Sequence, residues 1–108
     1  MNIVKKEGFV LENREKEYTE ISEMLKVMAH PVRLCIINGL IKKGECNVTH
    51  MQNCLGKPQS TISQHLQKMR TAGIIESRRD GLEIYYRIKD QNIKNVMEIL
   101  CKESGGNL

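Results

Sequence analysis

Residues 57–88 read KPQSTISQHLQKMRTAGIIESRRDGLEIYYRI, and this stretch decides the fold. In its first half, apolar residues recur only at Ile62, Leu66 and Met69, which is the spacing of one narrow apolar stripe on a helix. After Gly73 the period of the apolar residues changes to two, which is typical of strands. The stretch therefore predicts a helix with a mostly polar surface, followed by a β-hairpin.

The hairpin is predicted to run from Ile74 to Arg79, to turn at Asp80-Gly81, and to return from Leu82 to Ile88. Asp-Gly is a favoured pair in two-residue turns because both residues tolerate positive φ. A hairpin placed directly after a polar-surfaced helix is expected to form a wing beside that helix.

Helix start and stop signals divide the rest of the chain. A proline suits the first helical position, asparagine and aspartate side chains cap helix starts, and glycine ends helices. These signals predict a first helix that ends near Ala29, a second from Pro31 to Gly44, a third between Asn47 and Gly56, and a last helix from Asp90 to Cys101. The order is that of a mainly α winged helix-turn-helix domain (α-α-α-α-β-β-α).

The length of 108 residues is that of one domain, and the composition, 40% hydrophobic and 28% charged, is ordinary for a globular protein. We expect a flexible N-terminal arm over residues 1–15, the winged helix-turn-helix DNA-binding and dimerisation domain over residues 16–103, and a flexible tail over residues 104–108. A chain of this size has a small core, so the apolar stripes of its two end helices favour a homodimer.

The chain is expected to be cytoplasmic and to have no membrane partner. It has no apolar run of the roughly 18 residues that a membrane span needs, and it begins without the apolar run of a signal peptide. In the cytoplasm its four cysteines are expected to be reduced thiols, acting as packing residues or as a sensor.

Positive charge is concentrated in the segment that decides the fold. The formal net charge is +4, and residues 57–89 account for all of it with seven bases and three acids. A basic segment favours a polyanionic partner, although a solvated basic face without a partner is the alternative.

The helix that starts near Pro58 has the composition of a helix that reads the major groove of double-stranded DNA. Gln pairs with adenine, and Ser and Thr hydroxyls reach bases or phosphates. The residues expected to face the groove are Gln59, Ser60, Thr61, Ser63 and Gln64. Those expected to hold the phosphate backbone are Lys68, Arg70, Arg78 and Arg79, together with His65, for which packing is the alternative.

From about Ile21 to Cys101 the sequence resembles the ArsR/SmtB family of dimeric winged-helix repressors. The matching pieces are LKVMAHPVRLCIINGL, KPQSTISQHLQKMRTAGII and SRRDGLEIYYRI. The resemblance implies a homodimer, built on the first and last helices, that binds an inverted-repeat operator and leaves it when an inducer is sensed. One departure is Pro58, where the family commonly has a serine that caps the helix.

Cys46, His50 and Cys54 are spaced four residues apart, so on a continuous helix they share one face. Thiolate and imidazole ligands suit zinc and softer metal or metalloid ions. The metal-sensing motif of the family at this place, ELCVCD, is here ECNVTH, and no histidine follows His65. A metal- or metalloid-responsive repressor is one alternative, and ordinary surface or core side chains are the other.

Cys35 and Cys101 resemble the cysteines of another branch of the family, whose members oxidise a pair on these two helices to a disulfide or polysulfide bridge. The resemblance implies a thiol switch, with each cysteine about one helical turn earlier than in those members. The alternative is that both residues are small buried hydrophobes without a sensing role. We expect a repressor released by a cysteine-based redox or sulfur signal, with no required cofactor; a repressor without a small-molecule sensor is the alternative.

The sequence argues against an enzyme, because it has no Gly-rich phosphate loop and no motif of paired carboxylates. A winged helix that binds only proteins is a remote alternative. The basic hairpin argues against it.

Overall fold

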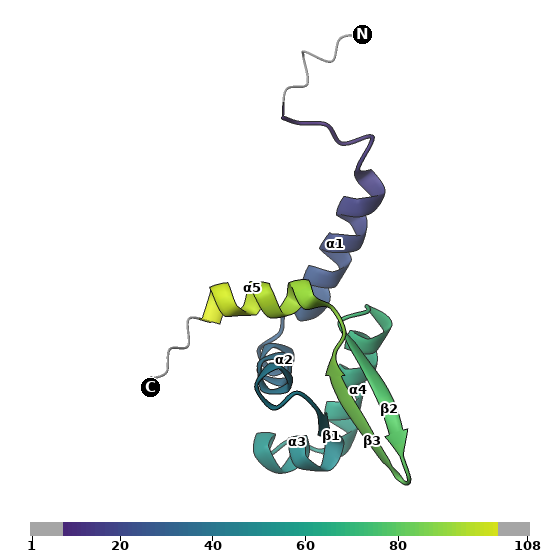
Figure 1. Cartoon of the computed structure of the whole chain (residues 1–108), viewed down its shortest axis with the longest axis vertical. Helices are drawn as coiled ribbons and strands as arrows, with labels where there is room; N and C mark the ends of the chain where they lie inside the picture. The colour runs from purple at the N-terminus through teal and green to yellow at the C-terminus, as the bar shows by residue number, and fades with distance from the viewer. Residues whose placement is uncertain (1–7, 102–108) are drawn as a thin grey trace.

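The computed structural model describes residues 8–101 (Figure 1). Its elements in chain order are α1 (Glu15–Met28), α2 (Pro31–Lys43), β1 (Cys46–Asn47), α3 (Val48–Leu55), α4 (Gln59–Thr71), β2 (Ile75–Asp80), β3 (Glu83–Ile88) and α5 (Gln91–Cys101). The predicted mainly α order, with a hairpin between the fourth and last helices, is confirmed. Residues 1–7 of the predicted arm and the whole predicted tail of residues 104–108 lie outside the described residues.

The helix boundaries follow the local signals in the sequence. The Asn47 side chain accepts a hydrogen bond from the His50 backbone N–H at 2.9 Å and so caps α3, and the Asp90 carboxylate accepts one from Asn92 at 2.9 Å at the start of α5. Gly56 ends α3 with a φ of 65°, a conformation that costs glycine little. Caps of this kind satisfy backbone N–H groups that a helix start leaves unpaired.

The sheet has three antiparallel strands in the order β1-β3-β2, one more than predicted. The additional strand is β1, whose residues Cys46 and Asn47 pair with Tyr86 and Tyr85 of β3. A two-residue strand has no periodicity of its own, so no local pattern in the sequence indicates it. Its pairing fixes the wing to the start of α3.

The turn of the wing lies one residue later than predicted. Asp80 pairs with Glu83, so the two turn residues are Gly81 and Leu82 instead of Asp80 and Gly81. Gly81 has a φ of 67° and occupies the first turn position, where both favoured hairpin turns require positive φ. As a result the Leu82 side chain is 96% exposed at the tip of the wing.

One hydrophobic core joins the helices to the sheet. The stripe predicted on α4 is fully covered, with Ile62, Leu66 and Met69 each at most 1% exposed. These side chains belong to the same cluster as Ile37 of α2 and Ile75 of β2. Within residues 8–101 the core contains no buried polar or charged side chain. The inner side of α4 is therefore held by apolar packing, which leaves its outer side available.

The two end helices are much less covered than α4. In Figure 1, α1 extends away from the body of the molecule, while α5 crosses above α2. Only Met28 of α1 is buried, and α5 buries Ile93 and Met97. Most of the apolar stripe of α1 and part of that of α5 remain exposed in one subunit.

Among the described residues, no single helix is long and apolar enough to cross a membrane. Taken together, α1 and α2 have the length and composition of a membrane span, but the two helices are bent by 97° at the break between them.

Candidate nucleic-acid interface

The outer side of α4 presents a continuous row of polar side chains. Because Ile62, Leu66 and Met69 face the core, the helical period places the remaining positions outward. Thr61 is half-buried. The exposed side chains are those of Gln59, Ser60, Ser63, Gln64, Gln67, Lys68, Arg70 and Thr71.

The start of α4 has no side-chain cap among the described residues. Pro58 occupies the capping position, and its carbonyl accepts from the backbone N–H groups of Thr61 and Ile62. The N–H groups of Gln59 and Ser60, like those in the first turn of any helix, have no intrahelical acceptor. Such an exposed helix start is suited to an anion such as a phosphate.

His65 differs from the other polar residues of α4 because it packs against α2. The Arg33 Nε–H donates a hydrogen bond to His65 Nδ1 at 3.0 Å, and the His30 ring lies 4.6 Å from the His65 ring, between centroids. Burial lowers the pKa of His65, and the electrostatic effects of His30, Arg33 and Lys57 lower it further. Because Arg can only donate, His65 is neutral here and carries its proton on Nε2.

The two arginines near the tip of the wing have different surroundings. Arg78 donates two hydrogen bonds to the Glu45 carboxylate, at 2.7 and 2.8 Å, and lies over the Tyr85 ring. The hydrogen bond from Arg78 lowers the pKa of Glu45. Arg79 is exposed and makes no ion pair with any residue of the described range. Arg79 is therefore the free cation of this pair, while Arg78 is held in place.

Lys68 and Arg70 lie in the second half of α4. Arg70 is 3.5 Å from the Gln67 side-chain oxygen, and Lys68 lines a surface hollow together with Lys26 and Arg33. Both side chains are exposed. Three basic groups thus border the hollow where α4 meets α1 and α2.

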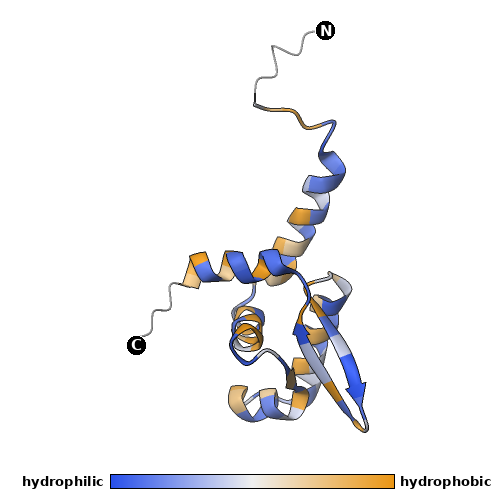
Figure 2. Cartoon of the chain, viewed as in Figure 1, coloured by the Kyte–Doolittle hydropathy of each residue, from blue (hydrophilic) through white to orange (hydrophobic). Residues whose placement is uncertain are grey.

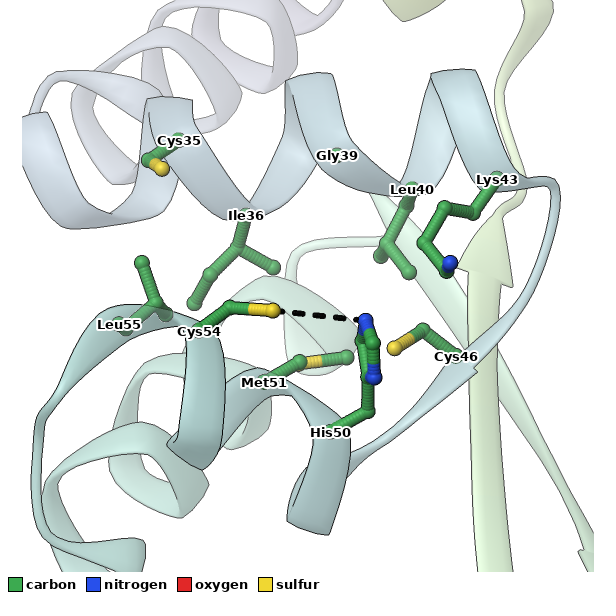
Figure 3. A pocket seen from close by; sticks show the side chains of 10 residues that line it. All are labelled: Cys35, Ile36, Gly39, Leu40, Lys43, Cys46, His50, Met51, Cys54 and Leu55. Atoms are coloured by element: carbon green, nitrogen blue, oxygen red, sulfur yellow. Dashed lines mark hydrogen bonds between the residues drawn. The ribbon is translucent and has the colours of Figure 1, made fainter.

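The cysteine and histidine side chains predicted as a metal site lie around one hollow between α2 and α3 (Figure 3). Cys46, His50 and Cys54 line it together with Cys35. Within the described residues, no group of three or more His, Cys, Asp or Glu side chains is arranged to hold a metal ion. The residues predicted as a metal site share a hollow, but as placed they form no coordination site.

The cysteines predicted as a thiol switch line two different hollows. Cys35 faces the hollow between α2 and α3, whereas Cys101 lines another between α2 and α5 with Asn38 and Ile41. Both thiols are free and exposed, so the alternative that they are small buried hydrophobes is wrong. The structure does not gather them into one hollow, and their pairing stays a prediction.

Two residues of this surface were not singled out from the sequence. Gln67 lies one helical turn after Ser63 and Gln64 on the exposed row, and the helical period already contained that signal. Glu45 precedes β1 and binds Arg78, 33 residues away in the chain. No local pattern in the sequence indicates such a contact.

Comparison with known proteins connects this surface to a family. The bacterial regulatory protein arsR family matches residues 30–77, which include the second to fourth helices and the first part of the wing. The transcriptional repressor PagR of Bacillus anthracis is 47% identical over 79 residues, which are 73% of this chain and 79% of PagR. The crystal structure of PagR has a TM-score of 0.74 at 43% identity, covering 80% of this chain and 98% of PagR.

Two further proteins extend the comparison. The biofilm growth-associated repressor of Xylella fastidiosa is 35% identical over 89 residues, 82% of this chain and 77% of that protein. A homodimeric winged helix-turn-helix DNA-binding domain from Mycobacterium bovis, a possible ArsR-family transcriptional regulator, has a TM-score of 0.77 at 25% identity, covering 84% of this chain and 83% of that one.

The family match, the identity to PagR and the shared winged helix-turn-helix fold agree with the polar outer side of α4. The chain belongs to the arsR family of bacterial regulatory proteins and is a DNA-binding transcriptional regulator, not an enzyme.

Proposed function

We propose that the protein is a cytoplasmic, homodimeric repressor that reads an inverted-repeat operator with α4 and holds the DNA backbone with the wing. The observation that carries this proposal is the exposed polar row of α4, anchored from below by Ile62, Leu66 and Met69. A helix held in this way fits the major groove, which is about 12 Å wide and admits one helix.

The exposed row supplies groups that discriminate between bases. Gln64 and Gln59 carry amides that pair in bidentate fashion with adenine, and Ser60 and Ser63 carry hydroxyls that both donate and accept. Thr61 is half-buried on the flank of the row, where its methyl group suits contact with a thymine methyl. We add Gln67 to this reading set because it is exposed on the next turn.

Basic groups border the reading row on both sides and suit phosphate contacts. Arg79 on the wing and Lys68 on α4 are exposed and have no ion-pair partner among the described residues. Arg70 and Arg78 are expected to contribute as well, although Glu45 already balances the charge of Arg78. His65 is left with its Nε2–H as a donor, because Arg33 occupies Nδ1.

The exposed apolar side chains of the end helices support a homodimer. Figure 2 shows apolar residues along both α1 and α5. They are Tyr18, Ile21 and Leu25 of α1 and Val96, Ile99 and Leu100 of α5. Monomeric proteins rarely leave contiguous apolar patches exposed. Two subunits related by a dyad would present their α4 helices to successive major grooves, about 34 Å apart.

We further infer that a cysteine-based signal releases the repressor from its operator. Cys35, Cys54 and Cys101 are free and exposed, so a small reagent can reach each of them. A metal or metalloid ion at Cys46, His50 and Cys54 is an alternative inducer, and a repressor without a small-molecule sensor is another. A bridge between Cys35 and Cys101 requires Cα atoms within about 7 Å.

The proposal is tested by footprinting and fluorescence anisotropy with the promoter upstream of the gene. We expect protection of an inverted repeat with half-sites one helical turn apart. Gln64→Ala should weaken discrimination at one base pair per half-site by about 1–3 kcal/mol, while binding to unrelated DNA stays unchanged. Gln91→Ala, an exposed glutamine of α5, is the matched control. If Gln64→Ala binds a library of sequences as the wild type does, α4 does not read the DNA.

A further inference from the structure

The hollow between α2 and α3 has the size and lining of a site for a small apolar molecule. Its volume is about 130 Å³, close to the engineered protein cavity of about 150 Å³ that holds benzene. Its apolar side chains are Ile36, Leu40, Met51 and Leu55, and Lys43 is the one charged side chain among the described residues that line it. The hollow is partly open, so a molecule can enter without unfolding the domain.

One thiol of this hollow has an imidazole partner. Cys54 Sγ lies 3.4 Å from His50 Nε2, because the two residues are one turn apart on α3. Figure 3 shows the Cys54 sulfur directed along the hollow toward the His50 ring. In the tautomer that leaves Nε2 without a proton, the His50 ring is placed to accept the thiol proton, and the thiolate is the nucleophilic form of cysteine.

The other three cysteines lack this arrangement. Cys46 lies on the far side of the His50 ring but is only 7% exposed, and burial raises the pKa of its thiol. Cys35 and Cys101 are exposed, yet neither has an imidazole within hydrogen-bond distance in the part of the chain that the structure describes. Cys54 alone combines exposure, a basic partner and an apolar hollow.

We propose that this hollow binds a small apolar conjugated carbonyl compound, an enone or a quinone, which Cys54 captures covalently. The Cys54 sulfur gives an electron pair to the β-carbon, so a C–S bond forms while the C=C π bond breaks. His50 takes the thiol proton and returns it to the adduct. The step consumes no oxidant or reductant.

The apolar lining of the hollow favours addition to a conjugated carbonyl over simple oxidation of the Cys54 thiol. A reagent that transfers only an oxygen or sulfur atom leaves nothing to fill an apolar hollow. A conjugated carbonyl leaves its carbon skeleton bonded to Cys54, where Ile36, Leu40 and Met51 bury it. Lys43 at the same hollow is suited to the oxygen of the adduct, where negative charge develops during the addition.

The consequence for DNA binding rests on the function proposed above. Cys54 lies two residues before Gly56, which ends α3, and Lys57 and Pro58 then lead directly into α4. We expect an adduct bonded to Cys54 between α2 and α3 to shift α3, which packs against α4. We therefore expect the adduct to move α4 and to weaken operator binding.

The test treats the reduced full-length protein with one equivalent of 1,4-benzoquinone and follows each cysteine by peptide mass spectrometry. Cys54 should react about tenfold or more faster than Cys35 and Cys101, because only Cys54 has a general base. His50→Gln should slow the reaction of Cys54 to the rate of those two thiols. The rate of Cys101 in the same variant is the internal control.

A second variant separates binding in the hollow from thiol activation. A Cβ at Gly39 meets no atom within 4 Å, so Gly39→Leu is expected to fold and to fill the hollow. It should slow the reaction of Cys54 with benzoquinone while its reaction with iodoacetamide, which needs no apolar site, stays near the wild-type rate. Equal rates at the three exposed cysteines, or a preference for Cys54 that survives both variants, would overturn the site.

The regulatory step has its own readout. Benzoquinone should lower operator affinity about tenfold or more in the wild type and leave that of Cys54→Ser unaffected, since only the wild type carries the adduct at residue 54. An adduct at Cys54 that leaves affinity unchanged refutes regulation through this hollow. If the untreated protein does not bind the operator at all, the function proposed above fails, while the labelling rates still decide whether the hollow is a site.

Discussion

The outer side of α4 exposes polar side chains, whereas the end helices α1 and α5 expose apolar ones. Along α4, the exposed residues are amides, hydroxyls and cations, while Ile62, Leu66 and Met69 beneath them are fully buried. On α1 and α5, by contrast, large apolar side chains remain in solvent, with Ile99 and Leu100 at 70% and 69% exposure (Figure 2). Polar groups suit DNA, and exposed apolar groups suit a second subunit. The difference supports the proposal that separate helices bind DNA and bind the partner subunit.

The largest effect is expected from breaking the apolar surface. Leu100→Glu places a charge where the proposed dimer buries a leucine, so the subunits should separate. Because each subunit then binds its half-site alone, operator affinity should fall by about 10²–10⁴-fold. Analytical ultracentrifugation and fluorescence anisotropy measure the two effects on the same preparation.

Gln91→Glu is the matched control for the dimer surface. Residue 91 lies nine positions before residue 100 on α5, so at 100° per residue it faces the opposite side of the helix. The Gln91→Glu substitution introduces the same charge on an exposed side chain and should leave both the dimer and the operator affinity intact. A Leu100→Glu protein that stays dimeric and binds the operator normally would show that α5 is not the interface.

A smaller effect is expected from the polar surface, where the two arginines of the wing differ. Arg79→Ala should weaken binding to all sequences about tenfold and reduce the slope of log affinity against log salt by about 1, because one phosphate contact is lost. Arg78→Ala should do less, since Glu45 already pairs with Arg78. Lys16→Ala, which removes an exposed cation from α1, controls for net charge. A larger loss from Arg78→Ala than from Arg79→Ala would contradict this assignment.

The same two surfaces show what the sequence predicts well. The polar row of α4 was predicted because its apolar spacing and the glycine after it are local features. The helix starts at Asn47 and Asp90 were predicted for the same reason. Their caps depend on residues only two or three positions away.

The features that the sequence did not predict depend on distant contacts. β1 exists because Cys46 meets Tyr86, and Arg78 is neutralised by Glu45. The stripe on α1 predicts an apolar side, but it does not reveal that one subunit leaves most of that side uncovered. For His65, the sequence allowed either a phosphate contact or packing. The structure places its ring against Arg33, 32 residues earlier.

The smallest effect, a change in stability, is expected at Arg33, whose side chain lies between α1 and α4. Arg33 donates to the Val27 carbonyl of α1 at 2.9 Å and to His65 of α4 at 3.0 Å, so this one side chain connects α1, which carries exposed apolar residues, to α4, which carries the polar row. Protonation of His65 removes the acceptor at Nδ1 and places a second cation beside Arg33.

The pH dependence of stability follows from the lowered pKa of His65. Because the folded state prefers the neutral ring, this contribution is complete above the unfolded pKa of about 6.5 and is lost as the pH falls through the lower folded value. His65→Gln should cost about 1 kcal/mol at pH 7.5, roughly the net value of one hydrogen bond, and should lose less stability than the wild type between pH 7.5 and pH 5. Urea denaturation at both pH values measures this, with His50→Gln, a histidine of α3 outside the Arg33 contact, as the control. A wild type and a His65→Gln variant whose stabilities fall in parallel would show that the folded state does not favour the neutral His65 ring.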